Sequence, residues 1–522
     1  MGSTTDSGRK LDVQRNAIDE QIAQLTDQIQ NLRSTRNGLA PVSLLSPELL
    51  VDIFCLARDM AGGKRRTRTA FSISWVSRDW RYLALSTPLL WNKIDFENTI
   101  YFTVSHERAR DVELELWVYH WAYTSSIEYI FPLLPQTRAL RIESPLNIGS
   151  PRKEAVFQRL CASVLRELHV ANFDVDTPGL SRISPLLHTL RLEGCTLEPN
   201  DLEVFPSLTT LSLSQLKLRI PVGQLLRLLE STPFLQRFKI NQILDEVDSS
   251  YPTNLPIYLS HLKSLEIGNE SAVPIVRFLP SIRIPSTADV VAELQIDQKA
   301  ESRDFSKVVP SIMACRHAEG EWPIVSLQVM DISSSVGLYV QSLAKHDREI
   351  STRIIINTWN DAPRVSSLLE LVKPHLLSLK SLDLTNSDVS GWCLGGVFAM
   401  LPNLSRISAS STAAVVFLEY FIGGSEPFLS EEFNQPGRQE GPQPLAFPGL
   451  REIVLTDMPD YLIRQCLKLG QLASTCSVRK GSGIGIEQFT FARCAIPDGV
   501  IANLRKVVKV EYIDDKLGRK GV

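Results

Sequence analysis

Apolar residues recur every seven positions near the start of the chain. The series is Leu11, Ile18, Leu25 and Leu32, and Ile22 and Ile29 fall four positions after two of its members. This alternation of fours and threes is typical of a coiled-coil seam, and it predicts a helix within residues 1–40 that is ended by Gly38 and Pro41. Three alternatives remain open for this helix: pairing with another helix, extending as a partly formed rod, or folding back onto the following domain.

Residues 41–97 predict a small helical domain. Ser46 can cap a helix, Pro47 suits its first position and Glu48 suits the positive end of its dipole. The apolar positions that follow with helical spacing are Leu49, Leu50, Ile53, Phe54 and Ala57. A loop over 62–68 then precedes a third helix, which carries Ile73, Val76, Trp80, Leu83 and Ala84 and ends at 86–88. The domain is only about fifty residues long, so its own core would be thin. Contact with a partner or with the next domain is therefore expected to stabilise it.

A leucine-rich motif recurs over residues 98–522. Residues 187–197 match the repeat template L-x-x-L-x-L-x-x-N/C-x-L at every fixed position. Related segments begin at Leu165, Leu208, Leu235, Leu262, Val291, Ile324, Leu379, Leu404, Leu450 and Ile486. Stacked turns of such a coil bury a core that one turn cannot bury alone. The pattern predicts a leucine-rich-repeat solenoid with a strand and a helix in each repeat, and an α/β fold class for the chain.

Helical patterns at 222–230 and 366–371 fit the helix of such a repeat. An insert near 423–449 is rich in Gly, Pro, Gln and Glu, so a mobile loop is expected there, with a shorter one at 245–256. The alternative to the solenoid is an ordinary α/β protein with buried strands.

Composition narrows the class of protein. The net charge of −3 argues against a protein whose whole surface binds nucleic acid, although it leaves a local basic patch open. No apolar run approaches the roughly 20 residues that span a membrane. The eight cysteines contain no Cys-x-x-Cys pair, which predicts reduced, mostly buried thiols. No apolar signal segment is found at the start of the chain, so an intracellular location, cytoplasmic and/or nuclear, is expected.

Catalytic motifs are absent from the sequence. No phosphate-binding P-loop, H-E-x-x-H or G-x-S-x-G motif occurs, and the glycine-rich stretch at 481–485 precedes a strand, which predicts a turn. We therefore expect no catalytic residue, cofactor or metal, although an enzyme with an unrecognised site in 110–522 remains an alternative. The basic run 64–68 predicts a solvated loop face, with a nuclear import signal or a phosphate contact as alternatives.

Residues 11–96 resemble a known family. The segments Leu45-x-Pro47-Glu48-Leu49-Leu50-x-Asp52-Ile53-Phe54 and Val76-Ser77-Arg78-Asp79-Trp80-Arg81-x-Leu83-Ala84 resemble the F-box. The stretch 86–91, and the heptad helix that ends in residues 36–41, are similar to the F-box-like proteins abundant in mushroom-forming fungi. The sequence departs from the family at two points: Ser46 splits the usual Leu-Pro pair, and Ser77 replaces the usual Cys.

The resemblance implies a non-catalytic adaptor of an SCF-type ubiquitin ligase. Its F-box would bind the linker protein Skp1, and through it a cullin, while the repeats would hold a client protein. The residues that the resemblance assigns to Skp1 binding are Leu45, Pro47, Glu48, Leu49, Ile53, Phe54, Val76, Trp80 and Leu83. Core packing within the helical domain is the alternative for each of them. A second possible function is a repeat scaffold that binds Skp1 outside any ligase.

Overall fold

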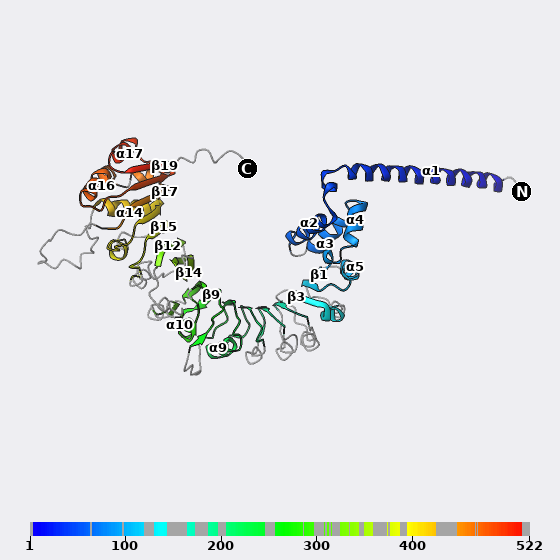
Figure 1. Ribbon diagram of the computed structural model, residues 1–522, viewed down its shortest axis with the longest axis horizontal. Coiled ribbons are helices and arrows are strands. Elements are labelled where there is room, and N and C mark those ends of the chain that lie inside the picture. The colour runs from blue at the N-terminus through cyan, green and yellow to red at the C-terminus, as the bar shows by residue number, and fades with distance from the viewer. Residues whose placement is uncertain are drawn as a thin grey trace. The chain divides into compact units, whose positions relative to one another are not determined.

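The computed structural model describes most of the chain. The described ranges are 4–62, 65–96, 99–119, 130–143, 164–172, 186–196, 205–245, 256–285, 287–296, 324–332, 335–343, 349–358, 376–386, 394–423, 446–464 and 468–513, with a few single residues between them. The fold is mixed α/β, with a helical region at the amino end and parallel β-structure after it (Figure 1). The chain divides into two compact units, Met1–Leu187 and His188–Val522.

The first unit begins with helices and continues into a parallel sheet. Its helical elements are α1 (Thr4–Gly38), η1 (Pro41–Leu44), α2 (Pro47–Met60), α3 (Arg66–Ser74), α4 (Arg78–Leu85), η3 (Pro88–Leu90), α5 (Thr99–Ala109) and η4 (Phe131–Gln136). Its strands are β1 (Lys93–Phe96), β2 (Leu114–Tyr119), β3 (Thr137–Glu143) and β4 (Glu167–Ala171), paired in that order and all parallel. The helical region therefore leads directly into a sheet through β1.

The ends of the first two long helices follow the predicted chemistry. Helix α1 ends at Gly38, and α2 begins at Pro47 with Ser46 as its cap. The prediction of a single third helix is wrong, because residues 66–85 form two helices, α3 and α4. The side chain of Ser77 accepts a hydrogen bond from the backbone N–H of Trp80 at 3.1 Å, which starts α4 afresh. Residues 66–68 were expected in the loop and instead form the first turn of α3.

The second unit alternates strands with helices. Its strands are β5 (Thr189–Glu193), β6 (Thr210–Ser214), β7 (Arg237–Asn241), β8 (Ile257–Tyr258), β9 (Ser264–Ser271), β10 (Ile282–Arg283), β11 (Asp289–Ile296), β12 (Ile324–Ile332), β13 (Ser335–Leu343), β14 (Glu349–Thr358), β15 (Ser381–Asn386), β16 (Arg406–Ser410), β17 (Glu452–Thr456), β18 (Gln488–Ala492) and β19 (Lys509–Ile513). Its helical elements are α9 (Val222–Glu230), α10 (Ala272–Phe278), η6 (Leu279–Ser281), η8 (Leu394–Phe398), α14 (Ser411–Gly423), α15 (Asp460–Ile463), η10 (Leu469–Gln471), α16 (Leu472–Gly481) and α17 (Asp498–Leu504).

Apolar residues of the repeated motif form continuous rows across neighbouring strands. One row joins Leu190, Leu211, Phe238 and Leu265 in register, and the next joins Leu192, Leu213, Ile240 and Ile267. A second pair of rows runs through Leu382, Ile407, Ile453 and Phe489, and through Leu384, Ala409, Leu455 and Phe491. All of these side chains are buried, so the rows form the core of the unit. Helix α9 covers Val222–Glu230, the range predicted from its apolar spacing.

Two features of the second unit differ from the predicted repeat. Val290 and Ala292, rather than Leu294 and Ile296, lie beside Leu265 and Ile267. The segment 289–296 carries apolar residues at 290, 291, 292, 294 and 296, so the spacing alone did not fix its register. In addition, β13 and β14 were not predicted: β13 pairs antiparallel with both β12 and β14, and this meander stands between β11 and β15.

A left-handed backbone residue follows directly after many strands. Asn172, Gly194, Gln215, Gln242, Ser411, Asp457 and Arg493 have φ between 49° and 61°, and each comes next after the last residue of a strand. Non-glycine residues seldom adopt this conformation, so its return at the same place shows one turn geometry used repeatedly. The predicted turn at 481–485 is confirmed, with Gly483 at φ +79°. The predicted helix at 366–371, and residues 424–445 and 246–255 of the two predicted inserts, lie outside the described residues.

Candidate partner-binding surface

Helix α2 has one buried face. Leu50, Phe54 and Arg58 follow one another at four-residue intervals, and all three are buried. Residues four apart lie on the same side of a helix, so this face packs into the helical region. Phe54 is 1% exposed, and its ring meets the ring of Trp80 from α4 with the centroids 4.7 Å apart.

A second apolar face of α2 is open to solvent. Leu49, Ile53, Leu56 and Met60 are spaced by four, three and four residues, which places them in one stripe along the helix. Their exposed fractions are 52%, 43%, 61% and 86%. We call these four residues the α2 stripe. Side chains of this size arranged in a line on a surface are typical of a binding site for another protein.

Local chemistry fixes the start of α2. The Ser46 hydroxyl accepts a hydrogen bond from the backbone N–H of Leu49 at 3.4 Å, and Pro47 occupies the first turn. Glu48 lies beside the unpaired backbone N–H groups of this turn, and its pKa is held below its ordinary value by its own backbone N–H and then by Ser46. The first residue of the stripe therefore follows a capped helix end.

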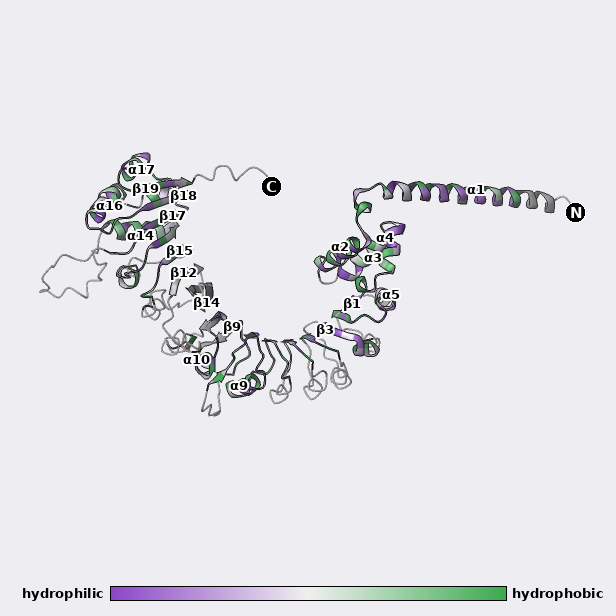
Figure 2. Ribbon diagram, in the orientation of Figure 1, coloured by the Kyte–Doolittle hydropathy of each residue, from purple (hydrophilic) through white to green (hydrophobic). Residues whose placement is uncertain are grey.

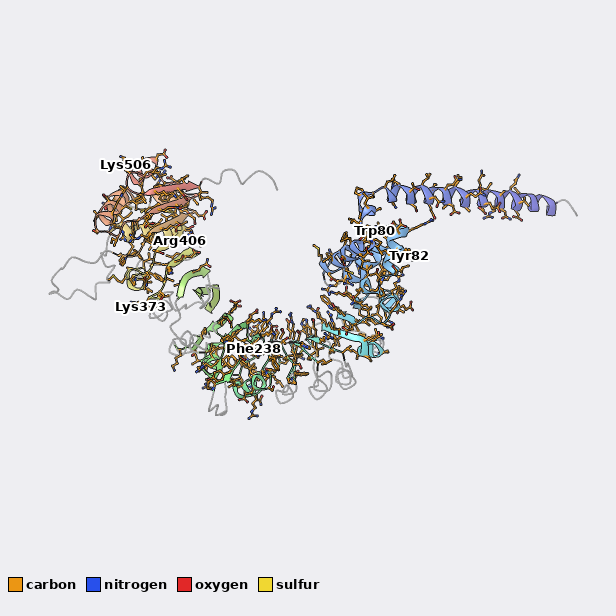
Figure 3. All side chains as sticks on the ribbon, in the orientation of Figure 1. Trp80, Tyr82, Phe238, Lys373, Arg406 and Lys506 are labelled. Carbon is orange, nitrogen blue, oxygen red and sulfur yellow. The ribbon has the colours of Figure 1, made fainter. Side chains whose placement is uncertain are left out.

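Helices α3 and α4 expose further apolar side chains. Trp75 and Val76 lie in the break between the two helices and are 64% and 55% exposed, and Tyr82 of α4 is 78% exposed. Trp80 is only partly exposed because one side of its ring packs on Phe54. Figure 3 labels Trp80 and Tyr82 on this helix. The exposed tyrosine adds a hydroxyl to a largely apolar surface, a combination common at protein interfaces.

A buried arginine ties α2 to the segment that leads into the sheet. The Arg58 guanidinium donates to the backbone carbonyl of Leu89 and to the Asn92 side chain at 3.1 Å, and its Nε donates to Asp59 at 2.9 Å. Lys93 of β1 donates to the same Asp59 carboxylate at 3.1 Å. Burial raises the pKa of Asp59, but the hydrogen bonds from Arg58 and Lys93 outweigh it and leave that pKa below its usual value.

An aromatic cluster holds the rest of the helical region together. The indole N–H of Trp91 donates to the backbone carbonyl of Ala84 at 2.7 Å, and the Trp91 ring meets Phe71 edge-on at 5.1 Å. The Arg108 guanidinium lies 4.3 Å from the centre of the Trp91 ring, and burial lowers the pKa of Arg108. These contacts pack α3, α4 and α5 together, and α2 packs on α3 and α4.

The predicted Skp1-binding residues fall into three groups. Those on the surface are Pro47, Glu48, Leu49, Ile53 and Val76; those half-buried are Leu45, Trp80 and Leu83; and Phe54 belongs to the core. Phe54 therefore takes the core alternative, since a side chain 1% exposed has no surface to offer. Sequence reasoning missed Leu56, Met60, Trp75 and Tyr82. The helical spacing that joins Leu49 and Ile53 continues to Leu56 and Met60, so the sequence already held the signal that identifies these two residues.

The sheet of the second unit has a polar open face. Arg191, Ser212, Lys239 and Glu266 stand in register between the first two buried rows. Arg406, Glu452, Gln488 and Lys509 also stand in register, next to the row through Ile407, Ile453 and Phe489. Lys239 and Glu266 form an ion pair at 2.9 Å, and the Lys509 ammonium donates to Gln488 at 3.1 Å. This face therefore mixes charges of both signs along the strands. Figure 2 shows polar and apolar residues alternating on the strands of this unit.

No group of three or more His, Cys, Asp or Glu residues is placed to hold a metal ion among the described residues. Of the six cysteines that the structure describes, five are buried, as predicted; burial raises the pKa of Cys466 to about 11 and that of Cys476 to about 12. In the basic run, Arg66 stacks 3.6 Å from the centre of the Trp117 ring. None of the described helices combines the length and apolar character needed to cross a bilayer.

Neither the protein-family models nor the curated proteins contain a match to this chain.

Proposed function

We propose that the chain is a non-catalytic adaptor that joins a client protein to a ubiquitin ligase. In this proposal residues 41–97 act as an F-box-like domain that binds Skp1, and Skp1 connects the domain to a cullin. The observation that carries the proposal is the α2 stripe, because α2 keeps Leu49, Ile53, Leu56 and Met60 exposed while its other face supplies the core. A helix used only for packing would leave polar residues on the open side.

The contact proposed for Skp1 is an apolar groove that receives the α2 stripe. Anchors at the first, fifth, eighth and twelfth positions of a helical segment suit recognition in which a helix lies in a groove. Val76 and Tyr82 would extend the contact from the neighbouring helices, and the half-buried Trp80 and Leu83 would border it. Phe54 would support the surface from beneath without touching the partner.

We further propose that the second unit is a leucine-rich-repeat solenoid that holds the client. Four observations support this: the apolar rows in register, the parallel pairing of most strands, the helices between strands, and the left-handed residue after successive strands. The open polar face of the strands would then select the client, because its side chains alternate with the core and are not needed for packing. The strands β13 and β14, which lie between β11 and β12, would be an insertion in the series.

Co-purification with Skp1 tests the adaptor proposal. The wild-type chain is expected to retain Skp1, and Leu49→Asp with Ile53→Asp is expected to weaken binding about 100-fold or more, because two carboxylates would be buried against an apolar groove. Leu218→Asp is a matched control, since Leu218 is 52% exposed like Leu49 but lies in the second unit. Circular dichroism of all three chains checks folding.

The results separate the alternatives. Failure of the wild type to bind Skp1 would exclude both the adaptor and the scaffold that binds Skp1 outside a ligase. Binding of Skp1 without recovery of a cullin in the assembled complex would favour the scaffold. An enzyme with a site in 110–522 has no specific observation in its favour in the part of the chain that the structure describes.

A further inference from the structure

Helix α1 carries an apolar seam that its own unit leaves open. Its members are Leu11, Ile18, Ile22, Leu25, Ile29 and Leu32, and their exposed fractions range from 49% to 71%. In Figure 2 apolar residues recur along α1 between polar ones. The structure therefore does not take the alternative in which this helix folds back on the domain behind it, and six large aliphatic side chains face water along a single helix.

A side-chain hydrogen bond between α1 and α4 involves a residue outside the seam. The Arg78 guanidinium of α4 donates to the side-chain oxygen of Gln30. Gln30 follows Ile29 and lies about 100° further round the helix, away from the seam. At the end of α1, the Ser43 hydroxyl donates to the backbone carbonyl of Asn37 at 2.8 Å. Both contacts hold the carboxyl-terminal end of the helix by groups outside the seam.

The spacing of the seam fixes its heptad phase. In a heptad, position d follows a by three residues and the next a follows d by four. Ile22 to Leu25 is a step of three and Leu25 to Ile29 a step of four, so Ile22 and Ile29 occupy a positions. The d positions are then Leu11, Ile18, Leu25 and Leu32. Isoleucine at a with mostly leucine at d favours a parallel pair of helices over trimers and tetramers.

The flanking positions are compatible with a second identical helix. In a parallel pair, each g residue faces the e residue of the next heptad in the other helix. The facing pairs are Gln14 with Asp19, Gln21 with Thr26, and Gln28 with Arg33, and none of them opposes like charges. Arg15 and Arg36 fall at a positions, and each would face its own copy in the second helix. Polar residues at a positions set register and strand number at a cost in stability.

We propose that α1 pairs with α1 of a second copy of this chain as a parallel two-stranded coiled coil. The seam supplies the apolar contact, the uncharged glutamines at g avoid repulsion, and the Arg15 and Arg36 pairs fix the register. Each dimer then carries two α2 stripes and two open sheet faces. The inference is independent of the proposed function, because α1 lies outside the residues proposed to bind Skp1.

The mass of the full-length chain in solution tests the proposal. Light scattering after size exclusion is expected to give twice the 58.4 kDa of one chain. Ile22→Asp with Ile29→Asp is expected to raise the dimer dissociation constant about 100-fold or more, because four carboxylates would meet in the seam. Gln24→Asp with Asn31→Asp adds the same charge at outer positions and is expected to remain dimeric. A monomeric wild type, or dimers that survive the seam substitutions, would overturn the proposal.

Cross-linking tests the orientation without relying on destabilised variants. Leu11→Cys places a thiol at the first d position, where only a parallel pair in register brings two copies of residue 11 together. Mild oxidation is expected to give a covalent dimer with Leu11→Cys, and no more than the wild-type background with Val13→Cys on the outer face. A dimer that fails to cross-link through position 11 would overturn the parallel arrangement.

Discussion

Phe54 and Trp80 pack ring against ring, with centroids 4.7 Å apart and planes inclined by 51°. Phe54 lies on the buried face of α2 and Trp80 on α4, so this contact fixes one helix against the other. Since Leu49 and Ile53 lie on the opposite side of α2, the same contact determines how the α2 stripe is presented. Core and surface roles are thus divided between neighbouring residues of one helix.

Truncating the ring of Phe54 is expected to destabilise the helical region. Phe54→Ala removes a side chain that is 1% exposed and leaves a cavity beneath Trp80, at a cost of about 3–5 kcal/mol. Leu49→Ala, on the exposed face, is expected to change stability by less than about 0.5 kcal/mol. Urea unfolding followed by tryptophan fluorescence checks both. Equal losses for the two variants would contradict the division of α2 into a buried and an exposed face.

Removing the Arg58 guanidinium is expected to loosen α2 from the segment that precedes the sheet. Arg58→Met keeps the aliphatic volume but leaves the Leu89 carbonyl and the Asn92 side chain without their donor, which costs about 2–3 kcal/mol. Arg81→Met is the control, because Arg81 is exposed on α4, and its loss is expected to cost less than about 0.5 kcal/mol. Hydrogen exchange of the β1 amides should rise in the first variant and stay unchanged in the second.

The stability contribution of Asp59 is expected to disappear in acid. Its folded-state pKa lies below the unfolded value of about 3.8, so its ionised form is favoured by folding. The contribution is therefore complete above the unfolded pKa and declines as the pH falls through the folded pKa. The test compares urea midpoints of the wild type and Asp59→Asn from neutral pH down to about pH 3. The gap between them should close in acid, whereas a gap that widened would show the opposite sign of the shift.

Local chemistry made parts of this fold predictable. The end of α1 at Gly38 and the cap at Ser46 each follow from one or two residues with strong local preferences, and the range of α9 follows from its apolar spacing. The apolar rows through Leu190 and Leu211 were also predictable, because a parallel ladder that buries one face allows few registers.

Other features were settled by contacts distant in sequence. The hairpin strands β13 and β14 lack the leucine spacing of the repeat template, so the template did not reveal them. The division between core Phe54 and exposed Ile53 required knowing where α4 lies, since both residues are apolar and adjacent. The left-handed residues after the strands are of six different types, because the turn constrains the backbone and not the side chain.

The left-handed turn after β6 gives a further prediction. Gln215 has φ of 49°, its side chain is exposed, and its backbone N–H donates to the Asn241 carbonyl at 2.7 Å. Gln215→Val is expected to destabilise the chain by about 1–2 kcal/mol, because a β-branched residue is strained there, whereas Gln215→Gly should gain up to about 1 kcal/mol. Ser212→Val, within the same strand, should be neutral or slightly stabilising because extended backbone favours valine. Thermal unfolding of the three variants checks the order, and a Gln215→Val chain as stable as the wild type would show that this turn carries no strain.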